Sequence, residues 1–433
     1  MEIKNILYIH THDTGRYIQP YGYNVPTPNL MKLAKEGTTF RQAYSVAPTC
    51  SPSRVGLLTG MSPHTAGMLG LAHRGFADLD YKKHLVQYLN REGFKTVLCG
   101  MQHEAPRSEM IGYQEILDSE DDIMNDEKNA KRVADYIQRE TGRNNLFLSF
   151  GMEYTHRPYP EPAEEINPDY LRSPFPVYDN RQTREDMAGF HTSVRNADSC
   201  IGMVLNALAE SELAENTLII YTTDHGIAFP RMKCNLYDTG VGVSLIMKYP
   251  GNKREGETVD ALVSQLDIFP TICDLFRLRK PEWLQGRTIY PLLQKETEKI
   301  REQIFTEVTY HAAYQPMRSV RTERYKLIRY FDEQGVVPAN IDDSLSKEFL
   351  IEHGYLNQLK DNELLFDLYF DPVERVNLMG DEKYQQIYED LSSRLEAWMR
   401  DTGDPLLEGK VEKPSGAVVN KIGSLSAELD EYE

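Results

Sequence analysis

The sequence predicts an α/β fold in which helices sandwich a large, mostly parallel sheet, followed by a smaller C-terminal antiparallel sheet with a helix on it. Over roughly the first 300 residues, short apolar runs alternate with amphipathic stretches, as in βαβ units. This alternation of apolar runs and amphipathic stretches changes past about residue 310. With 433 residues, the chain is also too long for one ordinary domain. We therefore expect an α/β domain over residues 1–310 and a smaller α+β domain with a surface tail over 311–433.

The strands of the larger domain are predicted where Leu, Ile, Val and Phe cluster. These runs span residues 5–10, 95–99, 146–150, 217–222 and 244–247. The first helix is predicted to have Thr27 as its N-cap and Pro28 in its first position, and to end at Gly37. Residues 186–211 carry helical periodicity and predict a long helix.

The smaller domain is predicted from alternating and amphipathic patterns after residue 310. Residues 317–321 and 325–330 read as a hairpin, 364–369 as another strand, and 381–400 as a long amphipathic helix. The polar tail from Asp401, with its Pro, Gly and Ser, is expected to wrap the surface or to fray.

Composition restricts the classes of partner. The formal charge of −18 argues against a broad nucleic-acid surface, because such binding needs Lys and Arg to replace phosphate counterions. Hydrophobic residues make up 40% of the chain and charged residues 26%, which is typical of a soluble globular enzyme. If the substrate is an anion, its pocket must be locally positive, so we expect a metal, Arg and Lys to gather there.

The N-terminal segment and the cysteines indicate a cytoplasmic protein. The segment lacks the pattern of a secretory signal, and no run of about 18 apolar residues predicts a membrane span. The cysteines are odd in number and scattered, which suits a reducing compartment without a disulfide framework. Of these, Cys99, Cys200, Cys234 and Cys273 are expected to be structural.

Polar side chains follow four of the predicted strands, each just beyond the carboxyl end. They are His12, Asp13, His103, His156, Asp224 and His225. In open α/β sheets, ligands bind outside the carboxyl ends of the strands. The sequence therefore predicts one site that is built from these side chains.

Cys50 lies in the run Pro-Thr-Cys-Ser-Pro-Ser-Arg, residues 48–54. Pro52 suits the first turn of a helix that residues 55–59 continue and Gly60 ends. Cys50 would then sit at a helix N-terminus, where unpaired amides and the helix dipole favour an anion. An isolated cysteine in such a turn is more often a packed side chain, since free cysteines are commonly buried.

The longer sequence around Cys50 resembles the signature of the type I sulfatases, in which Cys-x-Pro-Ser-Arg precedes Leu-Leu-Thr-Gly, here residues 50–60. Residues 5–13, 26–30, 223–226 and 366–378 resemble other segments of that family, so the resemblance extends over almost the whole chain. It is greatest to the sulfamidases, the N-sulfoglucosamine sulfohydrolases, over residues 50–71, 226–237 and 316–320. The resemblance implies the alkaline-phosphatase-like fold and a formylglycine made from Cys50 by a maturation enzyme.

The resemblance also implies one divalent metal, held by Asp13, Asp224 and His225 with His12. Clustered carboxylates need a cation, because several buried like charges are unfavourable alone. The family usually places two acids where His12 and Asp13 stand, and uses calcium. A histidine at position 12 shifts the preference from Ca²⁺ towards Mn²⁺ or Zn²⁺. The alternatives are a supporting role for His12 and a turn-capping pair at residues 224–225.

Four further residues are assigned roles by the resemblance. Arg54 is similar to the arginine that holds the formylglycine and the metal ligands, and His103 to the histidine of a Gly-Lys-x-His element. His156 is similar to the histidine that faces the leaving group, and Lys233 to the Lys or Arg that grips the transferring group. Their alternatives are a surface salt bridge for Arg54, a capping or core histidine for His156, and a solvated lysine for Lys233.

Two departures from the family pattern keep other functions open. Met101 replaces the lysine of Gly-Lys-x-His, which removes a cation beside the nucleophile, and His12 replaces an acid. The rival functions are a phosphonate or phosphate monoester hydrolase on the same scaffold and a binding protein for sulfated sugars without turnover. The substrate stays open among N-sulfated sugar, O-sulfated sugar, aryl sulfate and phosphonate. The resemblance to sulfamidases implies a homodimer. Further candidates for the pocket wall are His64, His73, Arg74 and His311.

Overall fold

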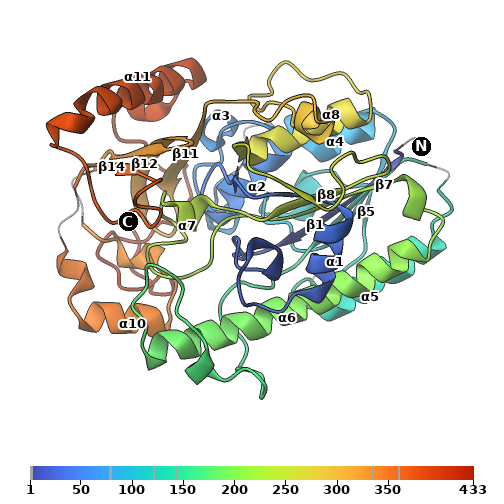
Figure 1. Cartoon of the computed structure of the whole chain (residues 1–433), viewed down its shortest axis with the longest axis horizontal. Coiled ribbons are helices and arrows are strands. Elements are labelled where there is room, and N and C mark those ends of the chain that lie inside the picture. Colours follow the sequence, from blue (N-terminus) through green and yellow to red (C-terminus); the bar gives the residue numbers. More distant parts are fainter. Residues whose placement is uncertain (1–2, 78–79, 120–121, 143, 333–334, 359–360) are drawn as a thin grey trace.

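A computed structural model of the chain describes residues 3–77, 80–119, 122–142, 144–332, 335–358 and 361–433. Its central feature is an eight-stranded sheet in the order β5-β4-β6-β1-β7-β8-β2-β9 (Figure 1). In this order the strands are Glu115–Ile116, Lys95–Gly100, Leu146–Gly151, Asn5–Thr11, Thr217–Thr223, Leu245–Lys248, Thr38–Phe40 and Glu257–Val259. The first five strands of this order, β5, β4, β6, β1 and β7, run parallel to one another. Strand β8 is antiparallel to its two neighbours, β7 and β2. The predicted mostly parallel sheet is confirmed.

The predicted strands are β1, β4, β6, β7 and β8, each within one or two residues of its expected bounds. The sequence did not predict β2, β5 and β9, which are only two or three residues long. Segments this short leave no periodicity to detect, and their pairing depends on neighbouring strands.

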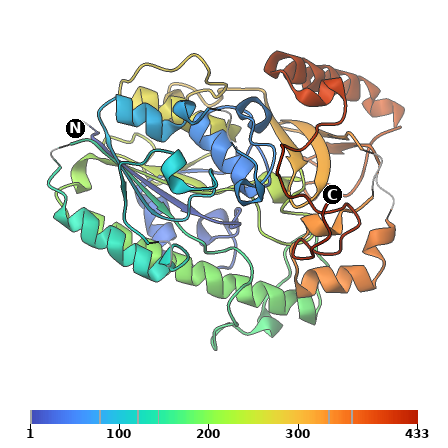
Figure 2. The same cartoon turned by 180° about the vertical axis from the view of Figure 1, so that it is seen from behind.

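Helices cover both faces of the sheet, and β1 shows why. Leu7 and Ile9 pack towards α1 (Pro28–Glu36), α5 (Asp126–Arg139) and α6 (Arg181–Ala209). Ile6 and Tyr8 pack towards α2 (Cys50–Thr59), α4 (Leu85–Arg91) and α8 (Ile268–Leu275). Alternate side chains of a strand point to opposite faces, so the continuous apolar run of β1 serves two cores. Figures 1 and 2 show these two helical layers.

The start of α1 differs from its prediction in one respect. Thr27 occupies the N-cap position and Pro28 the first turn, but the Thr27 side chain makes no capping hydrogen bond. Instead, the carboxylate of Asp198 in α6 accepts hydrogen bonds from the backbone N–H groups of Asn29 and Leu30, at 3.1 and 2.9 Å. A carboxylate from another helix thus satisfies the free amides of α1, which local sequence could not reveal.

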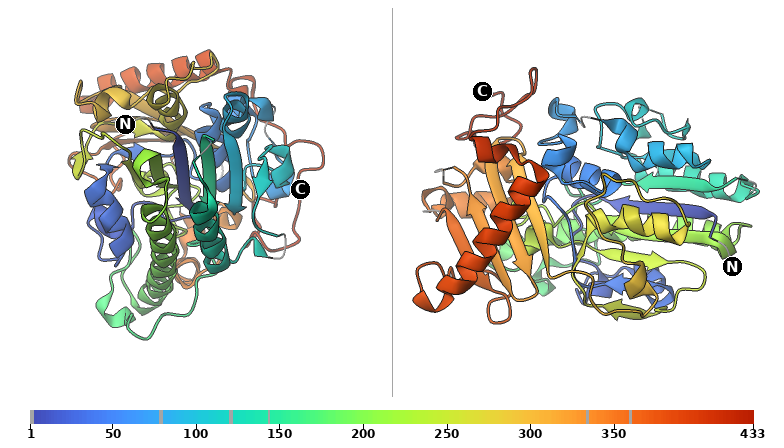
Figure 3. Two further views of the ribbon diagram at one scale, coloured as in Figure 1. Left: turned by 90° about the vertical axis from the view of Figure 1, so that its right-hand side faces the viewer. Right: turned by 90° about the horizontal axis from the view of Figure 1, so that it is seen from above.

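A separate four-stranded antiparallel sheet follows, in the order β11-β12-β13-β14. Its strands are Gln303–Tyr310, Tyr314–Thr322, Tyr325–Tyr330 and Glu363–Asp367. Helix α11 (Gln385–Thr402) crosses this sheet (Figure 3). This confirms the smaller antiparallel sheet with its helix. Because β11 pairs with β12, the sheet begins at Gln303; the domain boundary at residue 310 stays a prediction.

Shorter elements complete the fold. They are α3 (Pro63–Ala66), α7 (Asp238–Val241), α9 (Tyr290–Leu293), α10 (Leu345–Glu352) and the parallel pair of β3 (Ala43–Tyr44) with β10 (Val263–Ser264). Of the two outcomes expected for the C-terminal tail, wrapping or fraying, the structure shows wrapping. Val419 is buried, and Asn420 N–H donates to the carbonyl of Ala312 at 2.8 Å. Within the described ranges, no helix is both long and apolar enough for a membrane crossing.

Candidate active site

The carboxyl ends of β1 and β7 and the first turn of α2 meet at one place. One ligand atom each of His12, Asp13, Cys50 and Asp224 lies within 4.8 Å of the others. Cys50 is the first residue of α2, as predicted, and α2 ends at Gly60 in a left-handed conformation with φ 69°. The distant segments that were predicted to converge therefore do so.

Backbone hydrogen bonds fix the two acids relative to each other. Asp224 Oδ1 accepts from the backbone N–H of Asp13 at 2.8 Å and from that of His225 at 2.9 Å. Asp13 itself has a left-handed backbone with φ 55°, a conformation that costs energy and is common at functional sites. The following Gly226 is required by space, because a Cβ there would lie 1.9 Å from the carbonyl oxygen of Thr239.

Three further atoms of this group that could bind a metal have no hydrogen-bond partner among the described residues. His12 Nε2 lies 3.2 Å from Asp224 Oδ2, and His225 Nε2 lies 3.2 Å from Asp13 Oδ1. Among the described residues, His12 Nε2, Asp13 Oδ1 and His225 Nε2 are buried and make no hydrogen bond. Buried polar atoms without partners are costly. His12, Asp13 and Asp224 lie in one group, and His225 joins it through Asp13 and Asp224, at 3.2 and 3.8 Å, so these donor types fit a divalent cation.

Arg54 lies one turn beyond Cys50 on α2 and is 2% exposed. Its Nη2 is 3.1 Å from Asp224 Oδ2, and its Nη1 is 2.6 Å from His10 Nδ1. Burial and the nearby Arg54 lower the pKa of His10, so the neutral ring accepts this hydrogen bond. The surface salt bridge that was the alternative for Arg54 is thereby excluded, since the guanidinium is buried within the group.

Lys233 is also buried, and two carboxylates hold its ammonium. Its Nζ lies 2.8 Å from Asp13 Oδ2, 2.8 Å from Asp342 Oδ2 and 3.4 Å from His156 Nε2. Burial opposes the charged form, but the two carboxylates raise the pKa of Lys233 well above its ordinary value. Lys233 is therefore a fixed cation and not a solvated lysine.

His103 completes the group on the other side of His12. Its ring centroid is 5.7 Å from that of His12, and its Nε2 is 2.8 Å from His73 Nδ1. Burial, with His73 and Arg54 as further causes, lowers the pKa of His103, so the imidazole is neutral and can accept a proton. Met101, on the same loop, is 8% exposed and supplies no charge.

Burial also sets the protonation of the central groups. It raises the pKa of the Cys50 thiol well above its ordinary value, so the unmodified side chain is a poor nucleophile. It lowers the pKa of His12, which leaves a neutral imidazole of the kind that binds metals. Burial opposes ionisation of Asp224, but His225 and Arg54 hold its pKa below the usual range.

All nine residues predicted for the site lie in this one group, although their roles stay predictions. They are His12, Asp13, Cys50, Arg54, His103, His156, Asp224, His225 and Lys233. Of the candidates for the pocket wall, His73 contacts His103, whereas His64 lies in a different buried cluster with Glu307 and Asp404. Sequence reasoning missed His10, Glu153 and Asp342, which contact this group.

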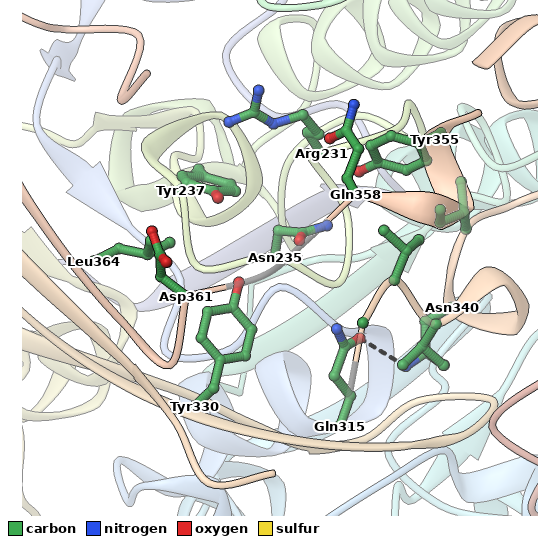
Figure 4. Close-up of a pocket in the computed structure, with 14 residues that line it drawn as sticks. Arg231, Asn235, Tyr237, Gln315, Tyr330, Asn340, Tyr355, Gln358, Asp361 and Leu364 are labelled. Carbon is green, nitrogen blue, oxygen red and sulfur yellow. Dashed lines mark hydrogen bonds between the residues drawn. The ribbon is translucent and has the colours of Figure 1, made fainter. Parts of the chain in front are cut away.

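A cavity lies beside the segments that carry Lys233 and Asp342, and Figure 4 shows the residues that line it. Its volume is about 220 Å³, and Arg231, Asn235, Asn340 and Ile341 belong to its lining. In the sequence, Lys233 lies between Arg231 and Asn235, and Asp342 follows Ile341. None of the nine predicted site residues belongs to its described lining.

Comparison with known proteins adds independent findings. The model of the sulfatase family matches residues 4–278, and a model described as "N-sulphoglucosamine sulphohydrolase, C-terminal" matches residues 225–339. The chain is 28% identical to N-sulphoglucosamine sulphohydrolase of Homo sapiens, over 97% of this chain and 93% of that protein. It is also 28% identical to an ulvan-active sulfatase of Formosa agariphila, over 97% of this chain and 78% of that protein.

Solved structures share the fold. One, a 2-O GAG sulfatase, superposes with a TM-score of 0.72 at 22% identity and covers 95% of each chain. Another, solved in complex with its substrate D-glucosamine-2-N,6-O-disulfate, has a TM-score of 0.74 at 18% identity and covers 95% of this chain and 100% of its own.

Proposed function

Since this chain belongs to the sulfatase family, we propose that it hydrolyses a sulfate ester or an N-sulfate of a sugar through a formylglycine made from Cys50. The observation that carries the proposal is the position of Cys50. Its side chain lies at the start of α2, within 4.8 Å of ligand atoms from His12, Asp13 and Asp224. An oxygen nucleophile formed at this position would meet the candidate metal ligands and the free amides of a helix N-terminus at once.

We propose that His12, Asp13, Asp224 and His225 hold one divalent metal. The unpartnered buried atoms of His12, Asp13 and His225, with His12 Nε2 3.2 Å from Asp224 Oδ2 and His225 Nε2 3.2 Å from Asp13 Oδ1, support this assignment. Two imidazoles beside two carboxylates favour Mn²⁺ or Zn²⁺ more than an all-oxygen site would, although Ca²⁺ is the metal that the resemblance implies. When bound, such a cation supplies Lewis acidity, which lowers the pKa of a coordinated hydroxyl.

The chain's own residues would then divide the work of the reaction. Arg54 neutralises Asp224 and keeps its carboxylate in place, at 3.1 Å. Lys233 and His156, which are 3.4 Å apart, lie where they can bind the transferring group and protonate the departing amine or alcohol. His103, held neutral by burial, can take a proton from the modified side chain when sulfate is released. Charge-stabilising groups such as Arg54 and Lys233 are typically worth about two to three powers of ten in rate each.

The substrate we propose is a small sulfated sugar. Two relatives support it: the human protein is named for N-sulphoglucosamine, and one structural neighbour was solved with a disulfated glucosamine. The formylglycine requires a maturation enzyme as a partner, and we propose a homodimer from the likeness to sulfamidases.

A substrate panel on aldehyde-bearing protein tests the function. We expect mass spectrometry of active protein to show residue 50 lighter by the difference between thiol and aldehyde, and Cys50→Ala to be inactive. Rates on N-sulfoglucosamine, an aryl sulfate and a phosphonate monoester then rank the substrates. Equal turnover by modified protein and by protein with unmodified Cys50 would show the mechanism to be wrong.

The second candidate is a phosphonate or phosphate monoester hydrolase, favoured by two observations. His12 takes the place of an acid, and Met101 takes the place of a lysine beside the nucleophile. A rate on the phosphonate monoester that exceeds the rates on both sulfated substrates would establish this alternative.

A further inference from the structure

Asp342 brings a third carboxylate to the proposed site, from the segment between β13 and β14. Its Oδ2 lies 2.8 Å from Lys233 Nζ, the same distance as Asp13 Oδ2. Single atoms of Asp13, His156 and Asp342 lie within 4.8 Å of one another. Asp342 therefore stands next to the groups that would contact a transferring group, and its side chain is 17% exposed.

The backbone that carries Asp342 is anchored on both sides. Two residues earlier, the Asn340 side chain donates to Gln315 Oε1 in β12 at 3.0 Å, as the dashed line in Figure 4 shows. Asn340 Oδ1 also accepts from the backbone N–H of Ala313 at 2.8 Å. Lys347 Nζ donates to the carbonyl of Ile341 at 2.7 Å. The backbone beside Asp342 is therefore fixed, and Lys233 holds the carboxylate itself.

Asp342 is charged in this position. Burial opposes ionisation, but the ammonium of Lys233 and the nearby His156 hold the pKa of Asp342 below its ordinary range. Two carboxylates thus share the single positive charge of Lys233. An anion that contacts Lys233 Nζ also comes near the negative charge of Asp342, whose Oδ2 is 2.8 Å from that atom, and each additional charge on the anion adds to the repulsion.

We propose that Asp342 makes the site select transferring groups with one negative charge over those with two. This rests on the proposed function, in which Lys233 contacts the transferring group. Sulfate esters and sulfamates carry one charge and phosphate monoesters carry two at neutral to alkaline pH. Both groups are tetrahedral and similar in size, so shape separates them poorly. A fixed carboxylate supplies the repulsive element that discriminates between them.

The test compares substrates that separate charge from shape. They are 4-nitrophenyl sulfate, with one charge, 4-nitrophenyl phosphate, with two, and 4-nitrophenyl phenylphosphonate, a phosphorus substrate with one. In aldehyde-bearing Asp342→Asn, which keeps a hydrogen-bond acceptor for Lys233, we expect the phosphate-to-sulfate ratio of kcat/KM to rise at least about ten-fold. The phosphonate-to-sulfate ratio should change less than about three-fold. Asp342→Glu, which keeps the charge, should retain the wild-type ratios.

A binding measurement gives a readout without turnover. In a Cys50→Ala background, Asp342→Asn should raise the affinity for 4-nitrophenyl phosphate relative to 4-nitrophenyl sulfate by a similar factor in calorimetric titration. Asp342→Ser, smaller and equally neutral, replaces the asparagine variant if circular dichroism shows that variant to be unfolded. An unchanged phosphate-to-sulfate ratio in a folded neutral variant overturns the proposal, as does an equal rise for the phosphonate. A wild-type enzyme that cleaves no sulfated substrate contradicts the proposed function instead, and the binding ratio still decides the role of Asp342.

Discussion

Replacing Arg54 tests whether its guanidinium holds the candidate metal ligands together. Arg54 and Asp224 are both buried, with Nη2 and Oδ2 3.1 Å apart. At an effective dielectric constant of about 20, two unit charges at this distance attract each other by about 5 kcal/mol. Arg54→Met keeps much of the apolar stem but removes the charge and the hydrogen bond to His10 at 2.6 Å. Removing one partner of a buried ion pair typically costs about 3–5 kcal/mol, because the other charge stays buried without compensation.

We therefore expect the free energy of unfolding of Arg54→Met to fall by about 3–5 kcal/mol, measured by urea denaturation with circular dichroism in the presence of a chelator. The matched control is Arg231→Met. Among the described residues, the Arg231 guanidinium forms no ion pair and lies 5.0 Å from the ring centroid of Tyr237. Its removal should cost about 1 kcal/mol or less. A loss below about 1 kcal/mol for Arg54→Met, or equal losses for both variants, would refute the reasoning.

Three further predictions concern His12, the buried Glu104 and Asn420. His12→Asp should shift the metal preference from Mn²⁺ or Zn²⁺ towards Ca²⁺, measured as metal affinity by calorimetry; an unchanged order would contradict a ligand role for His12. Burial raises the pKa of Glu104 to about 8. The folded chain therefore keeps a proton that the unfolded chain releases above about pH 5, so the free energy of unfolding should fall from pH 5 to 8. Glu104→Gln should flatten this fall in thermal unfolding curves, and a parallel fall in the variant would contradict it. Arg74 is a predicted residue of the pocket wall, and its Nη1 donates to Asn420 Oδ1 at 2.6 Å. Asn420→Ala should release this guanidinium and raise KM by roughly ten-fold with little change in kcat, whereas a loss confined to kcat would exclude Arg74 from the pocket wall.

The fold was predictable where one physical rule acts along a continuous segment. The apolar run of β1 and the periodicity of α6 each identified an element within a few residues of its observed bounds. The side chain that caps α1 could not be predicted, because the capping carboxylate belongs to Asp198, far away in the sequence. The short strand β5 was also missed, since two residues carry no pattern.

The site was predictable to the extent that its residues follow strands or lie in a recognisable motif. His12 and Asp224 follow buried strands, and Cys50 lies in the motif at the start of α2. Asp342 has neither signal, because it lies in a polar segment between strands and reaches Lys233 only through the tertiary fold. His10 is hidden for a different reason: it lies inside β1, where it reads as part of the strand and not as a partner of Arg54.

The enclosure of Cys50 constrains the timing of its activation. The folded protein leaves this residue 2% exposed, and the nearby loop that carries Arg74 is tied down by Asn420 and by the carbonyl of Ala427. The proposed maturation enzyme would have to take this thiol into its own catalytic centre, which the enclosure of Cys50 in the folded protein opposes. The proposed conversion of Cys50 is therefore expected on the unfolded chain, before the C-terminal segment docks against the loop that carries Arg74. On the proposed function, folding and maturation would compete, and a molecule that folds first would keep the thiol.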